Sequence, residues 1–308
     1  MRSVVFAYHD IGYVCLEELL RGGGEVIAVF THDDDPNENV WFRSVRQLAQ
    51  QHGIPVFAPV RINTPEWVER LHSWAPDFIF SFYYRNLLGA DVLAPAKRGA
   101  LNLHGSLLPR YRGRCPVNWV LIHDERETGV TLHYMEVKPD RGDIVAQRSV
   151  PISDDDTAVT LFHKLTAAAA LLMRETYPLL CSGKAARIPQ DHTRSSYFGG
   201  RRPDDGRINW NSSARQIFNL VRAVTRPYPG AFAEWNGRSF YIWEAHPWNG
   251  AQPNHGTPGT IVATQPQLIV QTGDGQLELS RVQAEGEDET SGPQWAAQRS
   301  VDKGAQLK

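Results

Sequence analysis

Cysteine is scarce in this chain of 308 residues, and long apolar runs are missing. The three cysteines, Cys15, Cys115 and Cys181, form no CxxC pair, so neither a disulfide framework nor a zinc site is indicated. No stretch approaches the ~18 apolar residues of a membrane span, and the N-terminal apolar run is too short for a signal peptide. We therefore expect a cytoplasmic protein that holds no metal and has no membrane partner.

The chain also lacks an excess of charge of either sign, with 32 basic and 34 acidic residues. No global field draws it to nucleic acid or to an anionic membrane, so any polyanion must be bound locally. Six of the basic residues are Lys and the rest are Arg, whose planar fork suits phosphate and carboxylate groups.

A dinucleotide fingerprint is missing as well, because His9 and Asp10 follow the first apolar run where GxGxxG would stand. Short apolar runs nevertheless alternate with amphipathic segments, which is typical of a parallel sheet with crossover helices. The predicted strands are 4–8, 26–31, 78–82 and 100–104, and the predicted helices are 11–20, 45–52 and 65–74. The sequence therefore predicts a doubly wound, mostly parallel α/β sheet without an NAD site.

The second part of the chain has a different pattern. After a long helix over 157–180, the apolar pattern breaks between 195 and 206, and short strand-like runs with Asn-Gly and Gly-Asp-Gly turns follow. We expect a catalytic domain over 1–203 and a small β-barrel domain over 204–308, whose polar residues from Glu285 onward form a frayed tail.

Two side chains that could take part in catalysis lie at the carboxyl end of the predicted strand 100–104. Asn102 and His104 are two residues apart, so they share a face at the edge where α/β sheets bind ligands. The amide can donate to an oxyanion and the imidazole can carry a proton, while Asp140 would favour the protonated imidazole if it folds against it. Taken alone, such an Asn-x-His pair is more often structural, and Asp140 before Arg-Gly is an ordinary turn residue.

The whole run Asn-Leu-His-Gly-Ser-Leu-Leu-Pro-Arg-Tyr-Arg-Gly-Arg-Cys-Pro over 102–116, with Thr-Gly-Val-Thr at 128–131 and Asp-Arg-Gly at 140–142, resembles the folate-dependent formyltransferases. The resemblance implies that 10-formyltetrahydrofolate is the one-carbon donor and that the C-terminal barrel is oligonucleotide-binding-like. It implies a catalytic trio of Asn102, His104 and Asp140. It also implies a folate site made of Asn86, Leu87, Leu88, Arg114, Glu136, Val137, Lys138, Pro139 and Asp140. Leu87 and Leu88 are equally compatible with a core role.

Within that family the chain is most similar to enzymes that formylate the 4-amine of UDP-4-amino-4-deoxy-L-arabinose, a step toward lipid A modification and polymyxin resistance. The likeness covers essentially the whole chain, and its stretches include 4–10, 80–85, 116–120, 199–205, 221–224 and 229–232. It implies a UDP-amino sugar as partner and a UDP-glucuronate dehydrogenase domain, fused or associated.

Other residues bear on the acceptor. The acidic loop 32–38 would repel a tRNA backbone, which favours a nucleotide sugar and no nucleic-acid partner. Trp41 and Phe42 are candidates to stack on a uracil, and core packing is about as good an explanation. Arg201, with Arg202 and Arg114, is a candidate to clamp a diphosphate, although surface ion pairing explains Arg201 and Arg202 equally well. His133 and His163 are most simply structural.

Several functions stay open at this point. The acceptor can be another nucleotide-linked amino sugar, or methionyl-tRNA, with the same chemistry. The same trio can pass the formyl group to water, which would make a formyltetrahydrofolate hydrolase. A nucleotide-sugar binder without activity is disfavoured because all three catalytic positions are filled.

Overall fold

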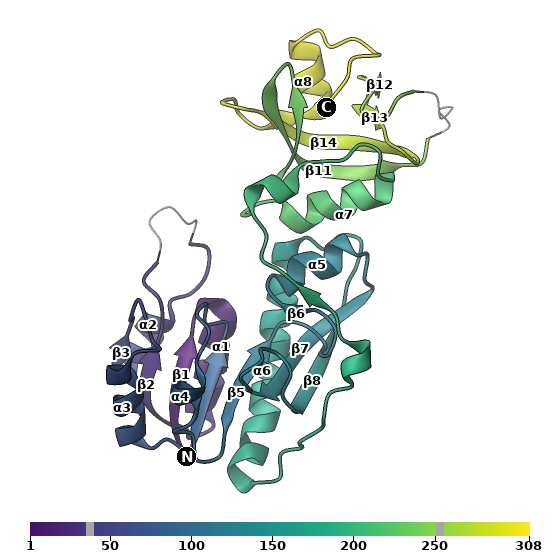
Figure 1. Cartoon of the computed structure of the whole chain (residues 1–308). Coiled ribbons are helices and arrows are strands. Elements are labelled where there is room, and N and C mark those ends of the chain that lie inside the picture. Colours follow the sequence, from purple (N-terminus) through teal and green to yellow (C-terminus); the bar gives the residue numbers. More distant parts are fainter. Residues whose placement is uncertain (35–39, 251–255) are drawn as a thin grey trace. The chain divides into compact units, whose positions relative to one another are not determined.

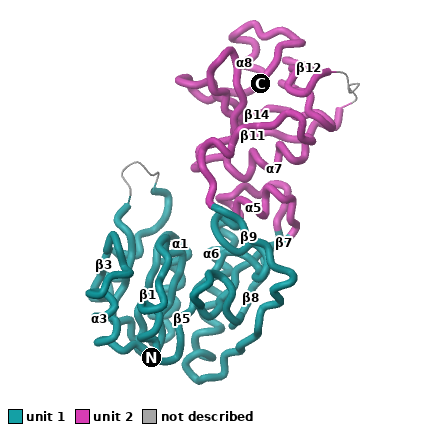
Figure 2. The backbone as a smooth tube through the Cα atoms, in the orientation of Figure 1, with its two compact units in different colours: residues 1–116, 127–151, 162–199 teal, residues 117–126, 152–161, 200–308 magenta. Residues whose placement is uncertain are grey.

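The computed structural model describes residues 1–34, 40–250 and 256–308. Contacts divide the chain into two compact units, shown in Figure 2. Unit 1 holds residues 1–116, 127–151 and 162–199, and unit 2 holds residues 117–126, 152–161 and 200–308. The predicted domain boundary between residues 203 and 204 stays a prediction.

Unit 1 contains a seven-stranded sheet with the order β3-β2-β1-β4-β5-β7-β8 (Figure 1). The strands are β1 (Arg2–Ala7), β2 (Glu25–Phe30), β3 (Val56–Phe57), β4 (Phe78–Phe82), β5 (Ala100–His104), β7 (Glu127–Tyr134) and β8 (Ile144–Pro151). The first five strands in this order are parallel, and β7 and β8 are antiparallel to their neighbours. The predicted mostly parallel α/β sheet is confirmed.

The central strands of this sheet are buried on both faces, as expected when crossover helices cover both sides. Val4, Val5 and Phe6 in β1 are all fully buried, and Phe6 stacks on Phe30 of β2 with ring centroids 4.5 Å apart. Unit 1 contains the helices α1 (His9–Arg21), α2 (Val45–Gln51), α3 (Pro65–Trp74) and α4 (Ala90–Leu93), most of α6 (Ala158–Ser182) and a 3₁₀ turn η1 (His192–Arg194). Helix α5 (Pro116–Ile122) lies almost entirely in unit 2. Among the described residues, no helix is both long and apolar enough to span a bilayer.

Unit 2 contains an antiparallel sheet with the order β10-β11-β14-β13-β12, and β15 pairs with β14. Its elements are η2 (Pro203–Gly206), α7 (Ala214–Val224), β10 (Ala231–Trp235), β11 (Arg238–Trp248), β12 (Ile261–Ala263), β13 (Ile269–Gln271), β14 (Gln276–Ala284), β15 (Thr290–Ser291) and α8 (Gly292–Gln298). The Asn236-Gly237 turn joins β10 to β11 as a hairpin, which agrees with the turn chemistry of that dipeptide.

The frayed tail predicted from Glu285 onward is wrong. Helix α8 begins after Ser291, whose hydroxyl accepts a hydrogen bond from the Gln294 backbone amide. Trp295 is fully buried and packs against Phe240, with ring centroids 4.4 Å apart. Few apolar residues stand in this segment, so its composition is polar, but one large aromatic side chain attaches it to the sheet.

Candidate active site

Strand β5 presents Asn102 and His104 on one face at its carboxyl end, as the alternation of a strand requires. Asn102 is half-buried and His104 is buried. The loop after β7 brings Asp140 to the same place, with its Oδ1 3.7 Å from His104 Nδ1. The three residues predicted as a catalytic trio therefore lie together in unit 1.

The tautomer of His104 follows from its hydrogen bond to the backbone. Its Nε2 lies 2.7 Å from the carbonyl oxygen of Tyr111, and because a carbonyl only accepts, Nε2 carries the proton. In the neutral ring Nδ1 is then the basic nitrogen, and it faces Asp140. A proton taken up at Nδ1 creates a cation beside a carboxylate.

The loop between His104 and Tyr111 is held against β7 by a threonine. Thr131 Oγ1 donates to the Ser106 carbonyl at 2.6 Å and accepts from the Leu108 amide at 3.1 Å. At Gly105, an added Cβ would lie 2.2 Å from the hydroxyl oxygen of Tyr83, so any larger residue there would require the Tyr83 side chain to move. These contacts give the Gly-Ser-Leu-Leu-Pro sequence a defined shape beside the trio.

Asp140 is held by contacts that the sequence does not reveal. Its Oδ2 accepts from the Gly113 amide at 2.8 Å. Gln190 Nε2 donates to the carbonyls of Asp140, at 3.1 Å, and Gly142, at 2.7 Å, and Arg112 Nη2 donates to Gln190 Oε1 at 2.6 Å. Gln190 lies 50 residues beyond Asp140, so no local sequence signal could have found it.

His133 of β7 also belongs to this cluster. Its Nε2 is 3.1 Å from Asn102 Nδ2, and its Nδ1 is 2.8 Å from the carbonyl oxygen of Tyr134. The side chain is almost fully buried, and burial lowers the pKa of His133 to about 4. The ring is therefore neutral near pH 7. The sequence favoured a structural role for this residue, because its contact with Asn102 depends on the pairing of neighbouring strands.

Apart from Arg114, the predicted folate residues occupy two largely exposed loops, one after β4 and one after β7. Leu87, after β4, is 72% exposed, whereas Leu88 is buried in the hydrophobic core of unit 1. Asn63 fixes the first loop by donating to the Leu87 carbonyl and accepting from the Gly89 amide. In the second loop Val137 is 80% exposed. The remaining predicted folate residues Asn86, Arg114, Glu136, Lys138 and Pro139 are exposed as well.

Trp41 and Phe42, the candidates for base stacking, are half-buried around His9. The His9 ring lies 3.9 Å from the Phe42 ring and 4.7 Å from the Trp41 ring, measured between centroids. Phe162 packs on the same imidazole at 4.5 Å, and burial lowers the pKa of His9 to about 4. Both predicted aromatics thus already have packing partners.

The acidic loop predicted at 32–38 is described only in part, since residues 35–39 lie outside the described residues. Asp33 forms an ion pair with Arg46, and Asp34 accepts a hydrogen bond from the Tyr8 hydroxyl at 2.8 Å. Both described carboxylates therefore have partners within unit 1.

The arginines proposed for a diphosphate belong to different units. Arg114 is in unit 1, where its backbone amide donates to the Phe198 carbonyl at 2.9 Å. Arg201 is in unit 2, where its guanidinium lies 4.8 Å above the Trp119 ring and donates to the Asp205 carbonyl. The backbone amide of Arg202 donates to the Asp205 carboxylate.

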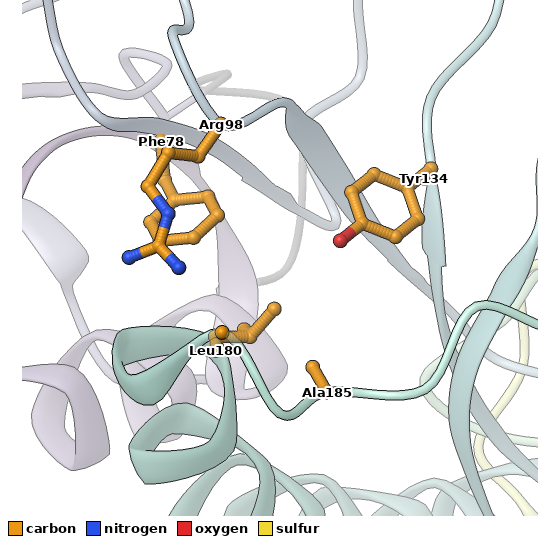
Figure 3. A pocket seen from close by; sticks show the side chains of 6 residues that line it. Phe78, Arg98, Tyr134, Leu180 and Ala185 are labelled. Carbon is orange, nitrogen blue, oxygen red and sulfur yellow. The ribbon is translucent and has the colours of Figure 1, made fainter.

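A cavity of about 250 Å³ lies elsewhere in unit 1 (Figure 3). Two of its lining residues are Phe78, which begins β4, and Arg98, which precedes β5. The cavity therefore lies at the opposite end of these strands from His104. Arg98 donates to the Cys181 carbonyl at the end of α6, where a cation is favoured. The other lining residues are Tyr134, Leu180, Gly183 and Ala185.

Solved structures with the same fold include three formyl-transfer or folate-binding proteins. The N-formyltransferase of Helicobacter canadensis, in complex with folinic acid and dTDP-3-aminofucose, is 20% identical, with a TM-score of 0.69 over 90% of this chain and 98% of that one. A sugar N-formyltransferase from Shewanella is 15% identical, with a TM-score of 0.64 over 79% of this chain and 96% of that one. HypX from Aquifex aeolicus, in complex with tetrahydrofolic acid, is 17% identical, with a TM-score of 0.63 over 100% of this chain and 50% of that one.

Because these identities are low, the structures show a shared fold and no more. Family models identify the chain more specifically. The formyl transferase model matches residues 1–176, and the model of the formyl transferase C-terminal domain matches residues 201–300. The first match covers more than half of the chain and includes Asn102, His104 and Asp140. The protein belongs to the formyl transferase family.

Proposed function

We propose that this enzyme transfers a formyl group from 10-formyltetrahydrofolate to the 4-amine of UDP-4-amino-4-deoxy-L-arabinose. The product would be UDP-4-formamido-arabinose, a precursor for lipid A modification and polymyxin resistance. The observation that carries the proposal is the cluster of Asn102, His104 and Asp140 at the carboxyl end of β5 in a formyl transferase. The choice of sugar rests on the likeness to the formyltransferase domain of the bifunctional polymyxin-resistance protein ArnA.

The geometry supports a defined role for each member of the trio. As the amine attacks the formyl carbon, Asn102 donates an amide N–H to the oxyanion. His104 takes the amine proton at Nδ1, and Asp140, 3.7 Å away, stabilises the resulting cation. His104 then gives this proton to the nitrogen of the donor as the carbon–nitrogen bond breaks, so the imidazole returns to its neutral form.

The loops that the resemblance assigns to folate fit a flat, partly apolar ligand. The donor supplies the formyl group when bound. Leu87 and Val137 expose apolar side chains that can contact a pterin ring, and Asn63 keeps the backbone of the first loop in place. We assign Asn86, Leu87, Leu88, Arg114 and the segment 136–140 to this site.

A nucleotide sugar is supported as the acceptor over tRNA by the charge balance of the chain, which offers no excess of positive charge for a phosphate backbone. Trp41, Phe42 and Arg201 are the proposed contacts to the nucleotide. A second candidate is a TDP-linked amino sugar, since the Helicobacter enzyme of the same fold was crystallised with dTDP-3-aminofucose. If the arabinose assignment holds, a UDP-glucuronate dehydrogenase, fused or separate, would act earlier in the same pathway.

One assay distinguishes these functions. The enzyme is incubated with 10-formyltetrahydrofolate alone, with UDP-4-amino-4-deoxy-L-arabinose, or with dTDP-3-aminofucose, and release of tetrahydrofolate is followed. Release that depends on the UDP sugar, with a formylated product detected by mass spectrometry, supports the proposal. Release that depends on the TDP sugar supports the second candidate. Release without any amine indicates a hydrolase, and no release in any reaction indicates a binder without activity.

A further inference from the structure

His133 is a buried imidazole in contact with the candidate catalytic amide, and the proposed mechanism does not use it. It lies in β7 opposite Asn102 in the strand register, and its Nε2 is 3.1 Å from Asn102 Nδ2. We propose that His133 is a positioning residue for formyl transfer, which fixes the orientation of the Asn102 amide so that its N–H groups face the reaction. This inference rests on the proposed function of Asn102 as the oxyanion donor.

The tautomer of His133 is set on the side of the imidazole that faces the backbone. His133 Nδ1 is 2.8 Å from the Tyr134 carbonyl oxygen, and a carbonyl only accepts, so Nδ1 carries a proton. Burial keeps the ring neutral, which leaves Nε2 with a lone pair. Asn102 must then turn Nδ2, and not Oδ1, toward this nitrogen. The Tyr134 carbonyl thereby decides which way the amide lies, through the tautomer of His133.

This orientation matters because the two ends of an amide have opposite hydrogen-bonding character. Nδ2 has two N–H groups, and only one of them is donated to His133. The second N–H remains for the oxyanion that forms on the formyl carbon. If the amide were rotated by half a turn, Oδ1 would face the lone pair of His133 Nε2, and two acceptors would repel each other. The oxyanion would then lack the hydrogen bond from this N–H.

The charges around His133 fit the same role. Asp140 Oδ1 is 3.7 Å from His133 Nε2 and also 3.7 Å from His104 Nδ1. The other charged groups that act on His133 are His104 and Arg112, and both disfavour a cation there. A neutral His133 leaves the Asp140 carboxylate to the proton on His104.

Two conservative substitutions separate the hydrogen bonds of His133. In His133→Gln the terminal amide reaches the position of Nε2, so an acceptor for Asn102 remains. In His133→Asn the amide reaches only the position of Nδ1, so the bond to Tyr134 remains and the acceptor is lost. We expect kcat to fall by about 10-fold or more in His133→Asn, with both KM values within about 3-fold, and to change by less than about 3-fold in His133→Gln.

A double-mutant cycle and a control test the route of the effect. In an Asn102→Ala background, His133→Asn should cause no further loss of kcat, because the amide it positions is absent. Thr128→Val, a change at another buried position of β7, should leave kcat unchanged. Equal losses in the Asn and Gln variants, a larger loss in the Gln variant, or a full additional loss in the Asn102→Ala background would overturn the proposal.

Nuclear magnetic resonance of the side-chain amide of Asn102 gives a readout without catalysis. In ¹⁵N-labelled full-length protein, exchange of this amide with water should be slow in the wild type and His133→Gln and faster in His133→Asn. Unchanged exchange in both variants contradicts the positioning role even if the wild type proves inactive on every acceptor. Inactivity of the wild type with the expected exchange pattern would instead count against the proposed function alone.

Discussion

At the scale of single residues, a backbone hydrogen bond determines the tautomer of His104. The Tyr111 carbonyl holds the proton on Nε2 and so makes Nδ1 the basic nitrogen, beside Asp140. The position of Asp140 depends in turn on the Gly113 amide and on Gln190. The proposed proton acceptor, its counter-charge and the proposed oxyanion donor are thus held in place by the protein itself, which is the preorganisation that catalysis by hydrogen bonds and charges requires.

Removing the imidazole tests this arrangement. We expect His104→Ala to lower kcat for formyl transfer by a factor of about 10² to 10⁴, because the proposed mechanism assigns the amine proton to this imidazole. The matched control is His72→Ala, which alters an exposed histidine in α3. Steady-state kinetics, with thermal unfolding to verify the fold, gives the answer. Near-normal turnover in a folded His104→Ala protein would remove His104 from the mechanism.

Only those site residues that belong to the family motif could be predicted from the sequence. Asn102, His104 and Asp140 stand in a long family motif, so they could be nominated without a structure. Gln190 and His133 could not, because their contacts depend on loop paths and strand register rather than on spacing along the chain.

At the scale of elements, a two-residue strand pair supports the site. β6 (Arg112–Gly113) pairs in parallel with β9 (Tyr197–Phe198). Gly113 has a φ of +95°, and a Cβ there would lie 2.2 Å from the Phe198 carbonyl oxygen. Strands this short have no periodicity, so the sequence pattern did not predict them.

A methyl group at position 113 should therefore disturb both the β6–β9 pairing and the Asp140 carboxylate. We expect Gly113→Ala to destabilise the protein by about 1–3 kcal/mol and to lower kcat, because the Gly113 amide would move away from Asp140. Gly199→Ala is the control, since a Cβ there meets nothing within 4 Å. Chemical denaturation and steady-state kinetics of both variants test this prediction. Equal changes in unfolding free energy and kcat in the two variants would contradict it.

Helix α8 allows a similar test in unit 2. Trp295→Ala should lower the free energy of unfolding by about 3–5 kcal/mol, because it opens a cavity beside Phe240. Gln298→Ala, at an exposed position of the same helix, should change it by less than about 0.5 kcal/mol. Urea unfolding followed by circular dichroism measures both. A loss below about 1 kcal/mol for Trp295→Ala would mean that the segment after Glu285 contributes little to the stability of the sheet.

At the scale of the whole molecule, the two units contain different acid-sensitive groups. In unit 1, burial lowers the pKa values of His9 and His133 to about 4, so both are neutral when folded and take up protons more readily when unfolded. In unit 2, hydrogen bonds from Arg215 lower the pKa of Asp124 and bring that of Asp154 to about 2. These carboxylates are charged in the fold at a pH that protonates them in the unfolded chain.

Acid should therefore weaken the protein in two stages. As the pH falls from about 6.5 to 4, His9 and His133 are protonated in the unfolded chain but stay neutral in the folded protein. The free energy of unfolding therefore decreases over this range. From about pH 4 toward pH 2 the contribution of Asp154 is lost as its carboxylate is protonated in the fold. Urea midpoints measured across this range check the prediction, and His133→Gln should flatten the first stage. A midpoint constant from pH 6.5 to pH 4 would contradict it.

The sequence by itself determined the alternation of strands and helices in unit 1, the hairpin at Asn236-Gly237 and the identity of the candidate trio, because periodicity, turn chemistry and motifs are properties of neighbouring residues. The tertiary structure decided the rest. It brought Asp140 to His104, placed Gln190 and His133 around them and buried Trp295 in a segment of polar composition. Those contacts join residues far apart in the chain, and strand register and the packing of loops, which no local pattern encodes, determine which residues meet.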